Sequence, residues 1–266
     1  MYSSFQIAIK YFHYWITASN GKGHGIHSPF VYQLVRNVFN NKQSTPELMD
    51  IEKIRKELLA CDQMIEVEDF GAGSVSGLKQ HRKIKDIARY SLKSPKYARL
   101  LFHLARYINA ENIVELGTSL GITTAYLAAS NPNTKVISLE GAPAVAEFAS
   151  VQFRKLQLQN ISLVQGQFDE SLDGYFVQNL SSYDLVYIDG NHTYEATLRY
   201  FHFFLPLINE HTLMVFDDIH WSEGMERAWE EIKRDPAVSL TIDIFFVGLV
   251  FFRKTQLIPQ HFTIRY

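Results

Sequence analysis

From residue 112 onward, short apolar runs alternate with helical patterns, and this alternation constrains the fold more than any other feature of the sequence. It is typical of β-α units, in which a crossover helix joins two parallel strands. The expected strands are Asn112–Glu115, Lys135–Leu139, Ile161–Gln165, Tyr183–Ile188 and Thr212–Phe216. The expected helices between and after them are Ile122–Ala129, Ala144–Leu158, Tyr194–Ile208 and Glu223–Arg234. Five such steps predict a doubly wound sheet with helices on both faces.

The end of the chain departs from this alternation. Two apolar runs, Leu240–Phe246 and Leu249–Lys254, are separated only by Val247 and Gly248. Because no crossover helix fits between them, we expect them to pair antiparallel as a hairpin. The predicted fold is therefore α/β, with a seven-stranded, mostly parallel sheet that ends in an antiparallel hairpin.

The first 110 residues lack the alternation and are expected to be mainly helical. The expected helices cover residues 5–18, 29–40, 46–60, 79–90 and 95–109. A turn-rich loop, residues 21–30, separates the first two. We therefore predict a helical N-terminal extension over residues 1–93, which packs on or covers the site of a second domain over residues 94–266.

Composition excludes several classes of protein. Lys and Arg number 26 against 28 Asp and Glu, so the overall charge of −2 would not hold the chain to nucleic acid. A hydrophobic content of 47% excludes global disorder. The single cysteine, Cys61, cannot form an internal disulfide, which favours a reducing compartment. No segment resembles a signal peptide or a membrane span, so we expect a cytoplasmic protein without a membrane partner.

Two glycine-containing stretches are candidates for a nucleotide-binding turn. The first contains Gly71, Gly73 and Gly77, and the second contains Gly117 and Gly121. A nucleotide site needs a second strand about 20 residues later that ends in an acidic residue for the ribose hydroxyls. The first stretch is followed by a basic, helical pattern with no expected strand. The second is followed by a helix, a strand and Glu140, so the second is preferred and the first is expected to be structural.

The segment IVELGTSLGITTAYLA resembles the first motif of the class I S-adenosylmethionine (SAM) methyltransferases, in which an acidic residue precedes a Gly-x-x-x-Gly turn. The likeness covers about residues 112–254, and the terminal hairpin matches the seven-stranded sheet of that family. It implies SAM as the cofactor. It places the methionine part of SAM against Glu115 and Gly117, the ribose on Glu140, and adenine beside Gln167 and Phe168. The full set of expected cofactor contacts is Glu115, Gly117, Thr118, Ser119, Gly121, Glu140, Gly141, Gln167, Phe168 and Asp189.

Three carboxylates follow the fourth and fifth expected strands: Asp189, Asp217 and Asp218. Ligands of such sheets bind beyond the carboxyl ends of the strands. Unpaired carboxylates repel one another at close range, and a divalent cation would remove that repulsion. Hard oxygen ligands favour Mg²⁺, Mn²⁺ or Ca²⁺.

The segments YDLVYIDGNHTY and MVFDDIHW resemble the corresponding regions of catechol-type O-methyltransferases. That likeness implies a metal held by Asp189, Asp217 and Asp218, with His192 as the general base. Two departures stand out: His192 replaces the family's lysine, and Asp218 replaces its asparagine. A broader bacterial methyltransferase group also shares the D-G-x-H-x-Y and D-D motifs, with a metal less firmly implied.

The resulting hypothesis is SAM-dependent O-methylation of a small-molecule acceptor with help from a divalent cation. His220 and Trp221 are candidates to line the acceptor pocket, and His24, His27 and Phe30 are candidates for a lid. The aromatic residues near the N-terminus are expected to serve packing; they are Tyr11, Phe12, Tyr14 and Trp15.

Three alternatives remain open or are disfavoured by the sequence. Residues 79–99 carry eight Lys or Arg against one acid, a stretch that would suit RNA or protein methylation, although a solvated helix face is favoured. A non-catalytic SAM-binding protein is a further alternative. An NAD-dependent oxidoreductase is disfavoured, because the Gly-x-Gly-x-x-Gly fingerprint is absent after the first strand of the sheet domain. The sequence leaves a homodimer open.

Overall fold

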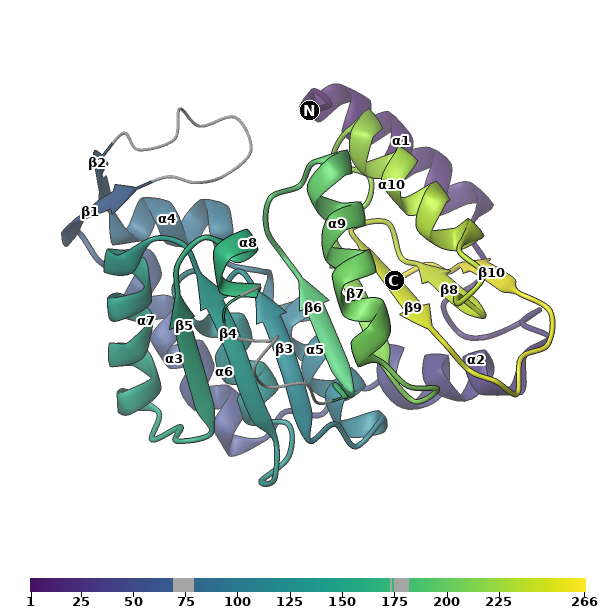
Figure 1. The fold of residues 1–266 in the computed structure, drawn as a ribbon, viewed down its shortest axis with the longest axis horizontal. Coiled ribbons are helices and arrows are strands. Elements are labelled where there is room, and N and C mark those ends of the chain that lie inside the picture. Colours follow the sequence, from purple (N-terminus) through teal and green to yellow (C-terminus); the bar gives the residue numbers. More distant parts are fainter. Residues whose placement is uncertain (69–78, 173, 175–181) are drawn as a thin grey trace. The chain divides into compact units, whose positions relative to one another are not determined.

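The structure is a computed structural model that describes residues 1–68, 79–172, 174 and 182–266 (Figure 1). The chain forms two compact units. The first combines Met1–Asn41 with Ser182–Tyr266, and the second is Lys42–Ser181. The N-terminal segment thus belongs with the C-terminal half of the chain. The predicted functional division at residue 93 stays a prediction.

The second unit is built on three parallel strands in the order β3-β4-β5. These are β3 (Asn112–Leu116), β4 (Lys135–Glu140) and β5 (Ile161–Gln165). The helices of this unit are α3 (Pro46–Ala60), α4 (Ile84–Ser91), α5 (Pro95–Tyr107), α6 (Ile122–Ala128), α7 (Pro143–Lys155) and α8 (Phe168–Ser171). Three of them begin with proline, whose missing N–H costs nothing at the first helical position. The expected β-α alternation is confirmed here.

A separate two-stranded sheet in this unit was not expected. β1 (Met64–Glu68) pairs antiparallel with β2 (Lys79–Lys83), so the expected helix over residues 79–90 begins only at Ile84. The prediction was wrong because pairing with β1 gives residues 79–83 their backbone hydrogen bonds, and helical apolar spacing starts only at Ile84. The first glycine stretch lies outside the described residues. The expectation that it is structural stays a prediction.

The first unit contains five strands in the order β10-β8-β9-β7-β6. They are β6 (Leu185–Ile188), β7 (Leu213–Asp217), β8 (Leu240–Asp243), β9 (Val247–Phe251) and β10 (Gln260–Thr263). β6 and β7 are parallel, β9 is antiparallel to both β7 and β8, and β10 is parallel to β8. The predicted antiparallel hairpin is confirmed. β10 is an eighth strand that the prediction of seven lacked, since its four residues, QHFT, show no apolar run.

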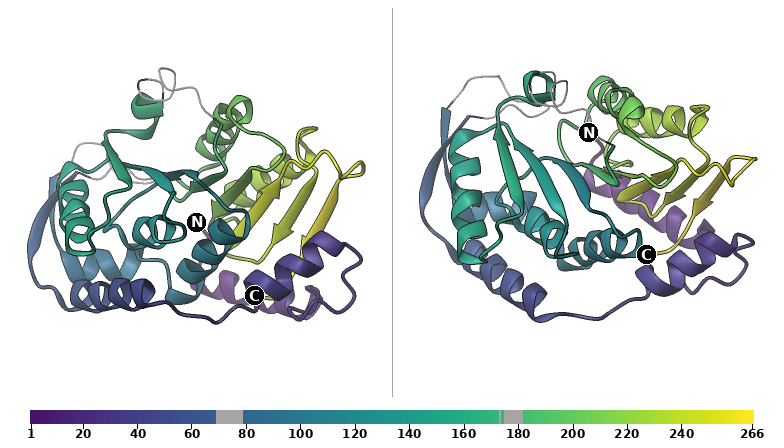
Figure 2. Two further views of the ribbon diagram at one scale, coloured as in Figure 1. Left: turned by 90° about the horizontal axis from the view of Figure 1, so that it is seen from below. Right: turned by 60° about the horizontal axis from the view of Figure 1, so that its bottom comes forward.

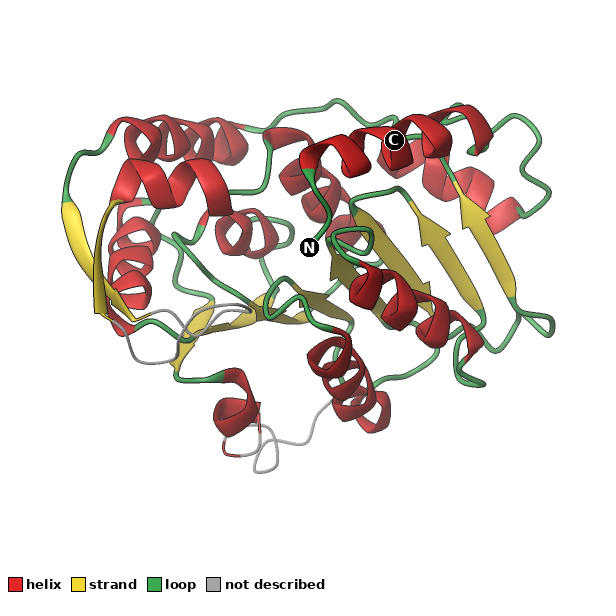
Figure 3. Ribbon diagram, turned by 90° about the horizontal axis from the view of Figure 1, so that it is seen from above, coloured by secondary structure: helices red, strands yellow, loops and turns green. Residues whose placement is uncertain are grey.

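The helices of the first unit flank these strands. They are α1 (Ser4–Thr17), α2 (Pro29–Leu34) with a following π-helical turn (Val35–Phe39), α9 (Tyr194–Phe204) and α10 (Glu223–Arg234). α9 and α10 cover one face of the strands, and α2 lies on the other face (Figure 2). Figure 3 shows helices in red and strands in yellow. Among the described residues, no helix is both long and apolar enough to cross a bilayer.

The aromatic residues of α1 divide between packing and exposure. Tyr14 is buried against Phe245, and Tyr11 also contacts Phe245, as expected of packing residues. Phe12 and Trp15, in contrast, are 66% and 45% exposed, so the packing prediction was wrong for Phe12 and only partly right for Trp15. Sequence spacing places all four on one helix but does not show which side of that helix is covered.

The hairpin turn lies at a different place from the expected one. β8 ends at Asp243 and β9 begins at Val247, and Phe245 between them has a φ of 73°. Gly248, predicted to be in the turn, lies inside β9. A Cβ atom at this position would lie 2.6 Å from the Trp229 ring. The glycine therefore allows α10 to approach the sheet closely and does not serve a turn.

We predict that Gly248→Ala destabilises the protein by about 1–3 kcal/mol, because the Trp229 ring must shift within a packed core. Gly224→Ala is the control: its Cβ would make only ordinary contacts in α10, where alanine is the better helix former. Urea denaturation of both variants measures the difference. Equal stability of Gly248→Ala and the wild type would contradict the prediction.

An ionic cluster attaches α1 to the C-terminal part of the first unit. His220 lies between two carboxylates, with Nδ1 2.9 Å from Glu226 Oε1 and Nε2 2.9 Å from Asp243 Oδ2. Lys10 and the Tyr2 hydroxyl both donate to Glu226. Because both ring nitrogens are engaged, His220 joins α10 to β8, and Glu226 links them through Lys10 to α1. The expectation that it lines an acceptor pocket has no support in these contacts.

The charge of His220 gives this attachment a pH dependence. Burial alone would lower the pKa of the imidazole, but Asp243 and Glu226 outweigh it and raise the pKa above its ordinary value. A histidine whose pKa is higher in the folded state than in the unfolded state stabilises the fold fully below the unfolded pKa of about 6.5. This contribution disappears as the pH rises through the raised folded pKa.

We therefore predict that His220→Gln lowers the free energy of unfolding more at pH 6 than at pH 9. Urea denaturation at the two pH values measures this difference. His211→Gln, at a side chain that is 80% exposed, serves as the control and should show little effect at either pH. A loss at His220 that is the same at both pH values would show that the ring acts only by packing.

Candidate functional site

The turn between β3 and α6 has an unusual backbone. Gly117, Ser119 and Gly121 all have positive φ, at 106°, 48° and 83°. The N–H groups of Gly117 and Thr118 both donate to the Leu139 carbonyl of β4, at 3.0 and 3.1 Å. The turn is therefore fixed to the end of the neighbouring strand, and its two glycines take conformations that other residues rarely adopt.

A buried network of hydroxyl groups and one carboxylate holds this turn in place through hydrogen bonds. Glu115 is fully buried, and its Oε2 accepts hydrogen bonds from Thr124 and from Ser138, the latter at 2.6 Å. Since Ser138 gives its only hydroxyl proton to Glu115, the Thr118 hydroxyl donates to Ser138. Glu115 thus anchors the turn. Its expected contact with the methionine part of SAM stays a prediction.

Gly121 has a packing reason for being glycine. It is the residue before the first turn of α6, and a Cβ there would lie 2.6 Å from the Phe153 ring of α7. The residue therefore lets α6 and α7 approach each other. Of the two glycines in the motif, Gly121 is explained by packing and conformation within the protein.

Glu140 lies at the carboxyl end of β4, where strand and turn meet. Its Oε2 accepts from the Ser119 N–H at 2.8 Å and its Oε1 from the Ala142 N–H at 3.0 Å. Burial raises the pKa of the carboxyl, although the backbone donors of residues 142, 119 and 141 oppose that shift. The carboxylate is held in one orientation by the backbone.

The end of β5 joins the same group. The Gly166 N–H donates to the Glu140 carbonyl at 3.0 Å, and Gln167 and Phe168 follow directly. The structure thus brings the turn of residues 117–121, Glu140 and Gly141, and residues 167–168 together at the carboxyl ends of three parallel strands. Of the cofactor contacts expected from sequence, only Asp189 lies in the other unit.

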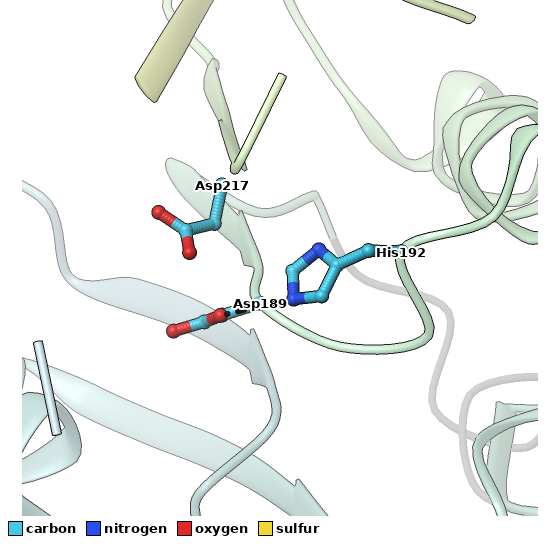
Figure 4. A group of neighbouring side chains, drawn as sticks. All are labelled: Asp189, His192 and Asp217. Carbon is cyan, nitrogen blue, oxygen red and sulfur yellow. Dashed lines mark ion pairs between the residues drawn. The ribbon is translucent and has the colours of Figure 1, made fainter. Parts of the chain in front are cut away.

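A group of metal-ligand type lies in the first unit. Asp189 follows β6, Asp217 ends β7, and His192 precedes α9 (Figure 4). One candidate ligand atom from each residue lies within 4.8 Å of the other two. Asp217 is only 1% exposed, and His192 Nε2 is 3.6 Å from Asp189 Oδ1. The Tyr187 hydroxyl donates to Asp189 Oδ2 at 2.8 Å, which fixes that carboxylate.

His192 comes from a short, constrained segment. Asn191 has a φ of 51°, a left-handed conformation that asparagine tolerates. The Thr193 N–H donates to the Asn191 carbonyl at 2.6 Å, and the Thr193 hydroxyl caps α9 by accepting from Ala196. The backbone on both sides of His192 is therefore fixed, and the imidazole ring is directed toward Asp189 (Figure 4).

Asp218, the third expected metal ligand, does not belong to this group. Its φ is 53°, and its N–H donates to the Phe246 carbonyl at 2.7 Å. Sequence adjacency suggested that Asp217 and Asp218 act together. Asp217 ends strand β7, whereas Asp218 has a left-handed conformation, which no sequence pattern shows. The expected role of Asp218 as a metal ligand stays a prediction.

Phe30, one of the three residues expected to form a lid, does not lie at this site. The Phe30 ring packs on Phe251 and lies 4.0 Å from the Arg253 guanidinium carbon. Phe251 pairs with Leu213 at the start of β7, whereas Asp217 ends that strand. Phe30 therefore lies toward the opposite end of β7 from the metal-type group, and the prediction that it covers the site was wrong.

Part of the basic stretch is neutralised by acids. Lys83 and Lys85 both form ion pairs with Asp62, and Arg89 pairs with Asp86. These pairs agree with the solvated-face interpretation of residues 79–99.

Part of the chain is similar to known proteins. Residues 114–219 match the sequence model of a family described as a methyltransferase domain. A catechol O-methyltransferase of Niastella koreensis is 29% identical over 128 residues, which cover 47% of this chain and 57% of that protein. The match thus spans little more than half of that relative's length.

Solved structures share the fold. An O-methyltransferase from Bacillus cereus, in complex with SAH, aligns with a TM-score of 0.57 at 21% identity, covering 84% of this chain and 97% of that one. The O-methyltransferase TomG from Streptomyces achromogenes, in complex with SAM, aligns with a TM-score of 0.56 at 17% identity, covering 84% and 95%. Residues 114–219 are thus similar to a methyltransferase domain, and the chain shares its fold with O-methyltransferases of known structure.

Proposed function

We propose that this protein transfers the methyl group of SAM to a hydroxyl oxygen of a small-molecule acceptor, with a divalent cation at Asp189 and Asp217. The observation that carries the proposal is the convergence of these two carboxylates at the ends of β6 and β7, one of them almost fully buried. The similarity to a catechol O-methyltransferase supports an oxygen acceptor, and the neighbours that hold SAM or SAH support the cofactor.

The residues of the second unit fit SAM. Backbone N–H groups occupy part of the acceptor capacity of the Glu140 carboxylate, and a carboxylate has about four lone-pair sites, so it can still accept a ribose hydroxyl. The positive φ values of Gly117 and Ser119 keep the turn open at the ends of the strands. Phe168 is half-buried and follows β5, close to the end of β4 where Glu140 lies. Its aromatic ring can stack on an adenine base.

The residues of the first unit fit a divalent cation. Two carboxylates within 4.8 Å of each other repel unless a positive charge lies between them. When bound, such an ion lowers the pKa of an acceptor hydroxyl and fixes its orientation. The chain's own contribution is to hold the carboxylates in place: the Tyr187 hydroxyl fixes Asp189, and the strand β7 fixes Asp217.

The reaction itself is an in-line displacement. The acceptor oxygen forms a bond to the methyl carbon while the carbon–sulfur bond breaks, its electron pair goes to sulfur, and SAH leaves. The acceptor hydroxyl gives up its proton, which passes to solvent water. The sulfonium already activates the methyl group, so the protein's task is mainly alignment of the oxygen with that methyl.

We predict that Glu140→Ala weakens SAM binding by about 1–3 kcal/mol, because the ribose hydroxyls lose their acceptor. Titration calorimetry with SAM measures the effect. Glu147→Ala, an exposed acid on the neighbouring helix α7, is the control and should bind SAM normally. Unchanged affinity in Glu140→Ala would remove this residue from the cofactor site.

We also predict that Asp217→Asn and added chelator both abolish methyl transfer while SAM binding persists. Catechol with radiolabelled SAM provides the assay. Asp218→Asn is a matched control, because asparagine accepts the left-handed conformation of residue 218 and this residue lies outside the metal-type group. Turnover that is indifferent to chelator and to Asp217→Asn would overturn the metal-assisted reaction.

A further inference from the structure

The distance between His192 and Asp189 is informative. At 3.6 Å, Nε2 and Oδ1 are too far apart for a hydrogen bond, which needs about 2.7–3.2 Å. Two ligands that each bind one ion at about 2.0–2.2 Å can, however, be 3.6 Å apart. The separation therefore suits two ligands of a common ion better than a histidine–carboxylate hydrogen bond.

The position of His192 is fixed in the manner expected of a ligand. It lies three positions after Asp189, and the left-handed Asn191 and the helix cap Thr193 hold the backbone on both sides. The His192 side chain is 23% exposed and the Asp189 side chain is 18% exposed, so both are largely shielded from bulk water. The imidazole takes the place beside Asp189 and Asp217 that sequence comparison assigned to Asp218.

The chemistry of this ligand set differs from an all-oxygen site. Mg²⁺ prefers oxygen ligands, whereas an imidazole nitrogen favours first-row transition ions such as Mn²⁺, Co²⁺ and Zn²⁺. We propose that His192 is a ligand of the metal, together with Asp189 and Asp217, and that it makes the site select a transition ion over Mg²⁺. This inference rests on the metal site of the proposed function.

The assignment changes the role of His192 in the reaction. An Nε2 atom that binds an ion cannot also take the proton of the acceptor. The general-base role expected from the sequence and the ligand role are therefore alternatives, and direct metal binding distinguishes them without any turnover assay.

Metal titrations of the apo protein test the proposal. We expect calorimetry with CoCl₂ or MnCl₂ to give binding at least about 10-fold tighter than with MgCl₂. His192→Ala should weaken Co²⁺ and Mn²⁺ binding by about 10-fold to 100-fold and leave Mg²⁺ binding nearly unchanged. His211→Ala, at an exposed histidine of the same unit, is the control and should bind all three ions like the wild type.

Pulsed electron paramagnetic resonance of the Mn²⁺-loaded wild type provides a readout that does not depend on a variant folding. We expect a nitrogen coupling from a directly bound imidazole. The coupling should disappear in His192→Ala and persist in His211→Ala.

The outcomes separate this inference from the proposed function. If Asp217→Asn loses all metal binding while His192→Ala retains it, or if the Mn²⁺ spectrum lacks nitrogen coupling, His192 is not a ligand and only the inference fails. A preference of the wild type for Mg²⁺ would also overturn it. If the wild type binds none of the three ions, both the inference and the metal assistance of the proposed function fail. The proposed binding of SAM by Glu140 does not depend on that result and is tested separately.

Discussion

The burial of Asp217 at the end of β7 is the constraint on which the first unit depends. A carboxylate that is 1% exposed has lost most of its hydration and must be compensated by neighbouring groups. The groups near it include an imidazole held by a constrained loop, and also a second carboxylate fixed by Tyr187, whose like charge increases the need for compensation. Because β6 and β7 pair in parallel, the residues at their carboxyl ends lie at the same edge of the sheet. The strand order and the chemistry of the site are therefore consequences of the same arrangement.

Much of this could be predicted from the sequence, because the physical rules involved are local. Buried parallel strands appear as short apolar runs, and residues that follow such runs gather at one edge of the sheet. Glu140, Asp189 and Asp217 were found by that reasoning, and each follows or ends a strand as expected. The glycine turn at residues 117–121 was chosen by its context, and its positive φ values agree with that choice.

The misses have a different origin: they depend on partners far away in the sequence. Residues 79–83 are polar throughout, and only pairing with β1 makes them a strand. The four residues of β10 depend in the same way on β8. Gly248 resembles a turn residue, but the Trp229 ring explains it. Asp218 directly follows Asp217, yet its left-handed φ value differs from the strand conformation of its neighbour. The φ value of a single residue and contacts between residues far apart in the chain produce no recognisable pattern in the sequence.

The hydroxyl network under the glycine turn affects how the cofactor site can respond to its ligand. Glu115, Ser138 and Thr118 hold the turn through buried hydrogen bonds that form when the chain folds. The loss of conformational entropy in this turn is therefore incurred during folding, before any ligand arrives. If SAM binds at β3 and β4 as proposed, it docks on a surface that is already ordered, and the affinity for different adenosyl compounds depends on their contacts and not on their ability to order the turn.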